Sequence, residues 1–238
     1  MEKIDSLFIS DVHLGSKGSN AEYLREVLKK YKFKKLFIVG DFIDGWLLKK
    51  RHHWPESHTK VLKKILSLSK KGVEVNYITG NHDDFLREYV PLNFGNIHVT
   101  DEAFYNGFFI THGDLYDPIV KYGKFISVLG AWGYELVINI NKVNNRIRLF
   151  LGMQPSSFSK FVKDSVKKAA KYIGHFEETL TDAAVKKGCT GVICGHIHTP
   201  QDKMIGRIRY LNCGDWIENN SYIIEKSGIF EIRTFENV

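Results

Sequence analysis

The chain has 238 residues, of which 43% are hydrophobic and 26% charged, the balance of a soluble globular protein with a sizeable core. The three cysteines (Cys189, Cys194 and Cys213) are odd in number and form no Cys-x-x-Cys pair, which argues against a disulfide framework or a zinc ribbon. The formal net charge of +7 fits a solvated lysine-rich surface, and equally an anionic membrane, a phosphorylated substrate or a nucleic acid as partner.

In the first half of the chain, strand patterns alternate with amphipathic helix patterns. Apolar runs predict strands at residues 7–10, 36–39 and 73–78, and helical spacing of apolar residues predicts helices at residues 21–31 and 58–71. This alternation is typical of an α/β fold with largely parallel strands. No export signal precedes the first strand, so we expect a cytoplasmic protein.

The second half contains further strand patterns and one insertion of a different character. Strands are predicted at residues 104–111, 191–194, 208–211, 222–225 and 229–233. Between them, residues 115–152 are rich in aromatic and aliphatic side chains, and residues 156–181 have the pattern of a long amphipathic helix. We interpret residues 1–238 as one domain and residues 115–181 as a helical cap inserted within it; the alternative is that the insertion is simply more core.

Residues able to bind a metal follow five of the predicted strands. Because the carboxyl ends of parallel strands meet at one edge of a sheet, where open α/β folds place their ligands, we expect these side chains to converge. Five of the ten histidines take part, together with two aspartates and an asparagine. The residues are Asp11 and His13, then Asp41, then Asn81 and His82, then His112, and finally His196 and His198.

This mixture of oxygen and imidazole ligands suits Mn, Fe or Zn, whereas an all-oxygen site would suit Mg or Ca. A pair of such ions can polarise a phosphate group and activate water. Asp41 is the natural bridge between two ions, since a carboxylate has two oxygens. His82 directly follows Asn81, so we expect its side chain to diverge from the metals and to serve as a general acid or as a stabiliser of charge on the phosphate.

At this point the sequence resembles the calcineurin-like metallophosphoesterases. The motifs occur in the family's order: DVH at 11–13, GDFID at 40–44, GNHD at 80–83, HGD at 112–114 and GHIH at 195–198. The resemblance implies an α/β fold, a four-layer α-β-β-α sandwich of two mixed sheets. It further implies two divalent ions, most simply Mn²⁺, one held by Asp11, His13, Asp41 and His198 and the other by Asp41, Asn81, His112 and His196.

The context of these motifs resembles one branch, the UDP-2,3-diacylglucosamine diphosphatases of lipid A synthesis. The shared features are GDFIDGW at 40–46, WP at 54–55, CGHIHTP at 194–200 and NCGDW at 212–216. The best-known form of that enzyme has Arg where His82 stands, and the His form is similar to a second group within the family. The resemblance implies hydrolysis of a UDP-linked acylated sugar; the alternative is a phosphodiesterase or nuclease of the same fold.

The predicted cap has features that fit a lipid substrate. Lys163 and Lys167 share one face of the predicted helix and could bind a nucleotide or lipid phosphate, or could be ordinary solvated lysines. The aromatic stretch 122–138 could line an acyl groove or belong to the core. We expect a peripheral position on the anionic inner face of the cytoplasmic membrane. No nucleic acid partner is expected, because no basic groove is interleaved with stacking aromatics.

Overall fold

The computed structural model describes residues 1–117 and 158–236, and for residues 158–170 it describes the backbone alone. The chain divides into two compact units, one made of Met1–Asp114 with Leu180–Val238 and the other of Leu115–Thr179. The proposed acyl groove at 122–138 and the side chains of Lys163 and Lys167 lie outside the described residues. The role of the insertion as a cap therefore stays a prediction.

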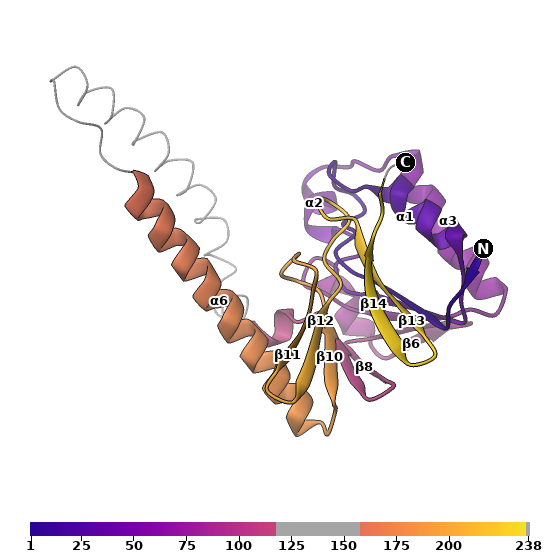
Figure 1. The fold of residues 1–238 in the computed structure, drawn as a ribbon. Coiled ribbons are helices and arrows are strands. Elements are labelled where there is room, and N and C mark those ends of the chain that lie inside the picture. The colour runs from indigo at the N-terminus through magenta and orange to yellow at the C-terminus, as the bar shows by residue number, and fades with distance from the viewer. Residues whose placement is uncertain (118–157, 237–238) are drawn as a thin grey trace, which may run out of the picture. The chain divides into compact units, whose positions relative to one another are not determined.

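A seven-stranded mixed sheet forms the larger half of the first unit (Figure 1). Its four central strands are parallel, and antiparallel strands close both edges. Two of these strands, residues 6–9 and 35–39, are largely apolar and buried because both of their faces are covered. In spatial order the strands are β14 (Ile229–Thr234), β13 (Ser221–Lys226), β2 (Ser6–Ile9), β4 (Lys35–Val39), β5 (Glu74–Ile78), β7 (Ile97–Thr100) and β6 (Leu92–Phe94).

A five-stranded sheet forms the other half, and it too has parallel strands at its centre and antiparallel strands at its edges. In spatial order its strands are β11 (Gln201–Ile205), β12 (Ile208–Asn212), β10 (Gly191–Cys194), β9 (Phe108–Thr111) and β8 (Glu102–Tyr105). A short parallel pair, β1 (Glu2–Lys3) with β3 (Tyr31–Lys32), stands apart from both sheets.

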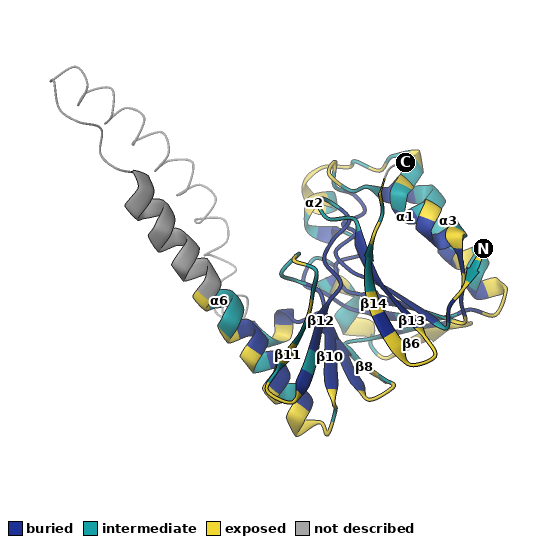
Figure 2. Cartoon of the chain, in the orientation of Figure 1, coloured by how far each residue is buried: buried dark blue, intermediate teal, exposed yellow. Residues whose placement is uncertain are grey.

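Two apolar clusters hold these layers together, and the strands are mostly buried (Figure 2). Between the sheets, Phe8 and Phe37 stack at a centroid distance of 4.6 Å and pack with Ile110 and Ile193 from the five-stranded sheet. The second cluster joins the outer face of the seven-stranded sheet to the helices α1 (Ala21–Lys30) and α3 (Glu56–Lys70). The expected α/β fold with two mixed sheets is confirmed.

The remaining helical segments are α2 (Gly45–Lys50), the 3₁₀ helices η1 (Asp84–Tyr89) and η2 (Asp114–Tyr116), and α6 (Phe158–Lys186). Asp44 caps α2, accepting a hydrogen bond from the backbone N–H of Leu47 at 2.9 Å. Among the described helices, none combines the length and the hydropathy that crossing a bilayer requires.

The structure corrects one sequence prediction and adds elements that were missed. The single strand expected at 104–111 is a hairpin of β8 and β9, because Asn106 and Gly107 both adopt positive φ angles, 47° and 80°. An Asn-Gly pair in this conformation makes the tight turn that joins antiparallel strands. The sequence analysis also missed α2, β6, β7 and β11, which are short. Cys194 is buried, and all three cysteines are free.

Candidate metal centre

Every candidate metal ligand lies in a loop at the carboxyl end of a strand, as the sequence predicted. The loops follow β2, β4 and β5 in one sheet and β9 and β10 in the other, and hydrogen bonds tie them together. The backbone N–H of His13 donates to the carbonyl of Asp41 at 2.9 Å, and the N–H of His196 donates to Asp11 Oδ2 at 3.0 Å. The N–H of His82 donates to Asp41 Oδ1 at 2.7 Å. The two sheets therefore share one centre.

Within the described part of the chain, three overlapping groups of side chains could hold an ion, each with ligand atoms within 4.8 Å of one another. Asp11, His13 and His198 form one group, and Asp11 and Asp41 with His112 form another. The third group joins His13 and Asp41 to His82. Because Asp11 and Asp41 each belong to two groups, the three groups make one continuous centre.

His196 and Asn81 lie beside this centre, although they belong to none of the three groups. The ring of His196 meets that of His112 edge-on, with 5.3 Å between centroids. Asn81 is placed by its two neighbours, since Gly80 lies against the Asp41 carboxylate and the N–H of His82 donates to it. The predicted ligand set thus comes together at one place, while the exact ligands of each ion stay a prediction.

Three of the predicted histidine ligands present Nε2 to the carboxylates of this centre and turn Nδ1 away. His198 Nε2 is 3.0 Å from Asp11 Oδ1, His112 Nε2 is 3.3 Å from Asp41 Oδ2, and His13 Nε2 lies between both carboxylates at 3.8 and 3.9 Å. On the far side, His112 Nδ1 lies 2.9 Å from the Val39 carbonyl, a partner that fixes the proton on Nδ1. A metal-ligating histidine usually donates a hydrogen bond from its other ring nitrogen to an acceptor of this kind.

The donor atoms include buried polar atoms with no well-formed hydrogen bond. Among the described residues, six buried side-chain atoms lack such a partner, and three of them belong to predicted ligands: Asp11 Oδ1, Asn81 Oδ1 and His112 Nε2. An unsatisfied buried polar atom costs about 1–3 kcal/mol, so three at one centre need a common explanation. Divalent ions supply one, since two oxygens and an imidazole nitrogen are suitable donors for Mn, Fe or Zn. The residues present therefore fit the metal centre that the family implies.

The backbone at these positions adopts a conformation that most residues avoid. Asp11, His13, Asp41, His196 and His198 all have positive φ angles, between 50° and 69°, and they make up five of the eight such non-glycine residues described. Left-handed conformations of non-glycine residues concentrate at functional sites, where the surrounding structure enforces them.

Two glycines allow the loops to approach one another closely. A Cβ atom on Gly80 would overlap the carboxylate of Asp41, and one on Gly195 would overlap Ser10 and the carboxylate of Asp11. Neither position has room for a Cβ atom, so glycine is required at both, whatever their backbone angles.

Electrostatics at the centre are those of buried carboxylates surrounded by imidazoles. Burial alone would raise the pKa of Asp41, but His112, His82 and His13 outweigh it and hold that pKa well below its usual range. Asp11 behaves in the same way: burial opposes, and His112 and His198 lower its pKa. Conversely, burial disfavours the charged form of His112, yet Asp41 and Asp11 raise its pKa well above the ordinary value. The lowered pKa values favour the ionised form of both carboxylates, which is the form that binds a cation.

His82 lies at the rim of the centre, partly exposed. Its Nε2 is 3.9 Å from Asp41 Oδ2, its Nδ1 is 3.1 Å from Asp44 Oδ1, and its ring packs against Trp46 at a centroid distance of 4.3 Å. Burial lowers the pKa of His82, but the carboxylates of Asp44 and Asp41 prevail and raise it. The ring is held with Nε2 inward, a position from which it could donate a proton or bind an ion.

Three acidic residues that support the centre were not predicted from the sequence. Asp44 lies between the outer nitrogens of two histidines, 3.4 Å from His13 Nδ1 and 3.1 Å from His82 Nδ1. Asp215 lies 3.7 Å from His198 Nδ1 and accepts hydrogen bonds from three consecutive backbone N–H groups, those of residues 217–219. Asp44 lies in the motif GDFIDGW and Asp215 in the motif NCGDW, so these motifs could have indicated both residues from the sequence.

The third, Asp83, is fully buried and fastens two ligand loops. Its Oδ1 accepts from the backbone N–H of Gly80 at 2.5 Å, and its Oδ2 accepts from the Tyr77 hydroxyl at 2.6 Å and from the N–H of Phe42 at 2.9 Å. Burial and the charge of Asp41 raise its pKa. Because Phe42 follows Asp41 and Gly80 precedes Asn81, Asp83 fixes the relative position of two predicted ligands.

His58 of α3 supports the loop that carries His13. It is 2% exposed, and its Nδ1 accepts a hydrogen bond from the backbone N–H of Gly15 at 2.9 Å. Burial, aided by the charge of His53, lowers its pKa. The accepting Nδ1 must be unprotonated, so the neutral imidazole is the form that stabilises the loop.

Comparisons with known proteins agree with this geometry. A family model described as "Calcineurin-like phosphoesterase" matches residues 5–200. The chain is 26% identical to the protein named UDP-2,3-diacylglucosamine hydrolase of Porphyromonas gingivalis, over 97% of both chains. It is also 26% identical to the protein of that name from Aliivibrio fischeri, over 97% of this chain and 98% of the relative.

Among solved structures, the phosphoesterase Yfce of E. coli is 17% identical, over 97% of this chain and 93% of its own, with a TM-score of 0.49. The family model spans most of the chain and includes all of the predicted metal ligands. The chain therefore belongs to the calcineurin-like phosphoesterase family and is a phosphoesterase hydrolase.

Proposed function

We propose that the chain hydrolyses the diphosphate of UDP-2,3-diacylglucosamine. Water adds to the α-phosphorus, the bond from that phosphorus to the bridging oxygen breaks, and the products are UMP and 2,3-diacylglucosamine 1-phosphate. The observation that carries the proposal is the similarity to the Porphyromonas gingivalis protein of matching name, which extends over 97% of both chains rather than over the shared motifs alone.

Within this proposal, Asp11, His13, Asp41, Asn81, His112, His196 and His198 would hold two divalent ions, Mn²⁺ in our proposal. When bound, such ions polarise the phosphate and make water a better nucleophile. The buried donors without hydrogen-bond partners support this assignment. Asp44 and Asp215 keep the outer nitrogens of their histidines occupied, so each Nε2 stays directed at the centre.

His82 is the proposed general acid. The pKa of His82 is raised, which favours the protonated imidazole, and Asp44 at 3.1 Å from Nδ1 stabilises that cation and orients the ring. Nε2 would then give its proton to the leaving phosphate oxygen as the bond breaks. Trp46, packed on one side of the ring, limits its rotation.

Selectivity for the acylated sugar is proposed to come from the insertion at 115–181. The site would take the phosphates, Lys163 and Lys167 would bind the anionic part of the substrate, and the protein would work at the inner face of the cytoplasmic membrane. Each buried CH₂ of an acyl chain contributes about 0.8 kcal/mol, so a few methylenes are enough to dominate discrimination.

The test is a comparison of kcat/KM for three substrates: UDP-2,3-diacylglucosamine, UDP-N-acetylglucosamine and a small chromogenic phosphodiester. We expect a preference for the diacylated substrate of at least about 10³, equivalent to roughly 4 kcal/mol. Lys163→Ala and Lys167→Ala should slow the lipid substrate more than the diester, whereas Lys226→Ala, on strand β13, should leave both unchanged. Comparable rates on all three substrates would instead favour a broader phosphodiesterase.

A further inference from the structure

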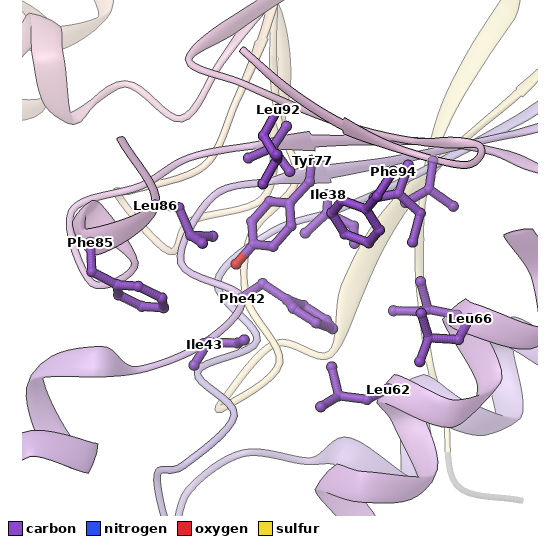
Figure 3. A pocket seen from close by; sticks show the side chains of 14 residues that line it. Ile38, Phe42, Ile43, Leu62, Leu66, Tyr77, Phe85, Leu86, Leu92 and Phe94 are labelled. Carbon is purple, nitrogen blue, oxygen red and sulfur yellow. The ribbon is translucent and has the colours of Figure 1, made fainter. Parts of the chain in front are cut away.

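An apolar cavity of about 250 Å³ lies on the outer face of the seven-stranded sheet (Figure 3). Its walls come from α3, from η1 and from strands β4 to β7, with Ile38 and Val75 on the sheet side and Leu62 on the helix side. The metal centre, by contrast, is built from the loops that follow the strands. The cavity is therefore a separate feature within the same unit of the chain.

The lining offers a ligand no polar partner. Its fourteen residues are aliphatic or aromatic, and the one with a polar atom is Tyr77. That hydroxyl is turned to the buried Asp83, to which it donates at 2.6 Å. A water molecule needs two to four polar partners, so this space does not suit ordered water. An apolar group is the matching occupant.

The opening of the cavity is surrounded by large apolar side chains that remain exposed. Leu66 of α3 is 47% exposed, Phe85 of η1 is 37% exposed, and Leu92 and Phe94 of β6 are 38% and 49% exposed. Single exposed apolar residues are ordinary, but four around one opening form a continuous apolar patch, which marks an interaction site. The four residues approach from three different elements (Figure 3).

The size of the cavity indicates a chain of medium length. A dry cavity of about 150 Å³ lined by similar side chains holds benzene, with six carbon atoms, so 250 Å³ scales to about ten carbons. A space of this size is too small for a large ring system, and an unbranched chain of about ten carbons fits it.

The helix side of the opening is cationic. Lys63 and Lys70 stand three residues before and four residues after Leu66, so at about 100° per residue they lie within about 60° of it around α3. Both lysines are exposed. An occupant whose tail fills the cavity would bring its head group to these ammonium groups, which favours a carboxylate or a phosphate over a neutral head.

We propose that this cavity binds the unbranched acyl chain, about ten carbons long, of an anionic amphiphile. A free fatty acid and the acylated substrate of the proposed function both carry such a chain. Binding would brace Tyr77, whose ring lines the cavity and whose hydroxyl holds Asp83, so an occupant would also stiffen the support of the Gly80–Asp83 loop.

The direct test is calorimetric titration of the full chain with hexanoate, octanoate, decanoate and dodecanoate, each below its micellar concentration. We expect Kd to tighten about fourfold per added CH₂ up to about ten carbons and little beyond. Leu66→Asp should weaken decanoate binding at least tenfold, while Met204→Asp, an equally drastic change at an exposed site on β11, should not. Lys63→Glu should weaken decanoate but not decanol, and Lys226→Glu should affect neither.

Several results would overturn the proposal: no saturable binding, an affinity independent of chain length, or the same decanoate affinity in Leu66→Asp and Met204→Asp. Equal effects of Lys63→Glu on decanoate and decanol would overturn the anionic head group. Leu62→Trp, which fills the cavity, is a second test: it should lose decanoate binding, and retained binding would overturn the proposal. Its thermal unfolding curve establishes that the variant folds.

Inhibition kinetics then distinguish the two sources of the chain. Decanoate that competes with UDP-2,3-diacylglucosamine, but not with a small diester, identifies the substrate's own chain. Decanoate that binds without competing identifies a free amphiphile. This arm alone rests on the proposed function; the titrations use no substrate, so a failure of the proposed function and a failure of the cavity proposal give different results.

Discussion

Replacing Asp83 by Asn tests whether this buried carboxylate positions the metal centre. The change keeps the shape of the side chain but converts one acceptor oxygen into an NH₂ donor. Three donors converge on Asp83, two on Oδ2 and the N–H of Gly80 on Oδ1. The favoured orientation of Asn keeps its oxygen toward Phe42 and Tyr77, which leaves the Gly80 N–H facing an NH₂ group.

The magnitude follows from this count. One buried N–H without an acceptor costs about 1–3 kcal/mol, and the two remaining bonds weaken by roughly 1 kcal/mol together when their acceptor becomes neutral. Asp83→Asn should therefore lower the free energy of unfolding by about 2–4 kcal/mol, a large part of the 5–15 kcal/mol typical of a domain. Turnover should fall as well, because Gly80 precedes Asn81 and His82.

Urea unfolding followed by circular dichroism measures the stability, and a diester assay measures turnover. Asp202→Asn is the matched control: it makes the same chemical change at an exposed carboxylate paired with Arg209 at 2.8 Å, where a loss of at most about 1 kcal/mol is expected. The reasoning is wrong if the two variants unfold at the same urea concentration and the Asp83 variant keeps full turnover.

Three further predictions concern the histidines. Metal binding near neutral pH should release at least one proton per chain, because the pKa values of His112 and His198 are raised and favour protonated imidazoles in the metal-free protein. Metal affinity should therefore weaken as pH falls. Calorimetry in buffers of different ionisation enthalpy measures the protons released, and a result of no release would contradict the prediction. His82→Ala should slow turnover by roughly 10²–10⁴-fold with metal content unchanged by elemental analysis, whereas loss of an ion would make His82 a ligand. The pKa of His58 is lowered in the folded protein, so as pH drops below about 6.5 the unfolded chain takes up a proton before the folded one, and the free energy of unfolding falls. His58→Asn keeps the acceptor for the Gly15 N–H, and its free energy of unfolding, measured in urea, should fall less between pH 7.5 and 5.5. An equal fall in both proteins would refute the assignment.

The sequence predicted three of the four central strands of the seven-stranded sheet, and the residues that meet at the ends of the strands, because both depend on local patterns. Strands buried on both faces tend to be apolar runs, and a polar residue just after such a run lies at the carboxyl edge of the sheet, where the other strand ends also lie. Asp11 and His198, separated by nearly the whole chain, come within 3.0 Å of each other for this reason. The family motifs then predicted that these residues are metal ligands.

What the sequence did not predict depends on contacts between distant segments. The supporting role of Asp215 requires knowing that its turn faces His198, and that of Asp83 requires the approach of Phe42 from another loop. Short elements such as β6 carry too few residues for a periodic pattern. The apolar cavity could not be predicted either, since Leu62, Phe85 and Phe94 each look like ordinary core residues in the sequence.

The left-handed backbone at the ligand positions also limits which amino acids can stand there. Asp, Asn and His are several-fold enriched among the non-glycine residues that tolerate positive φ, whereas β-branched residues are outliers. Two constraints thus act on Asp11, His13 and Asp41: the proposed coordination of an ion, and the positive φ angle of the backbone at each position. A variant library at these sites should be depleted of Val, Ile and Thr even under selection for folding alone. Grafting the same ligands onto another scaffold would likewise fail unless their loop conformations were transferred with them.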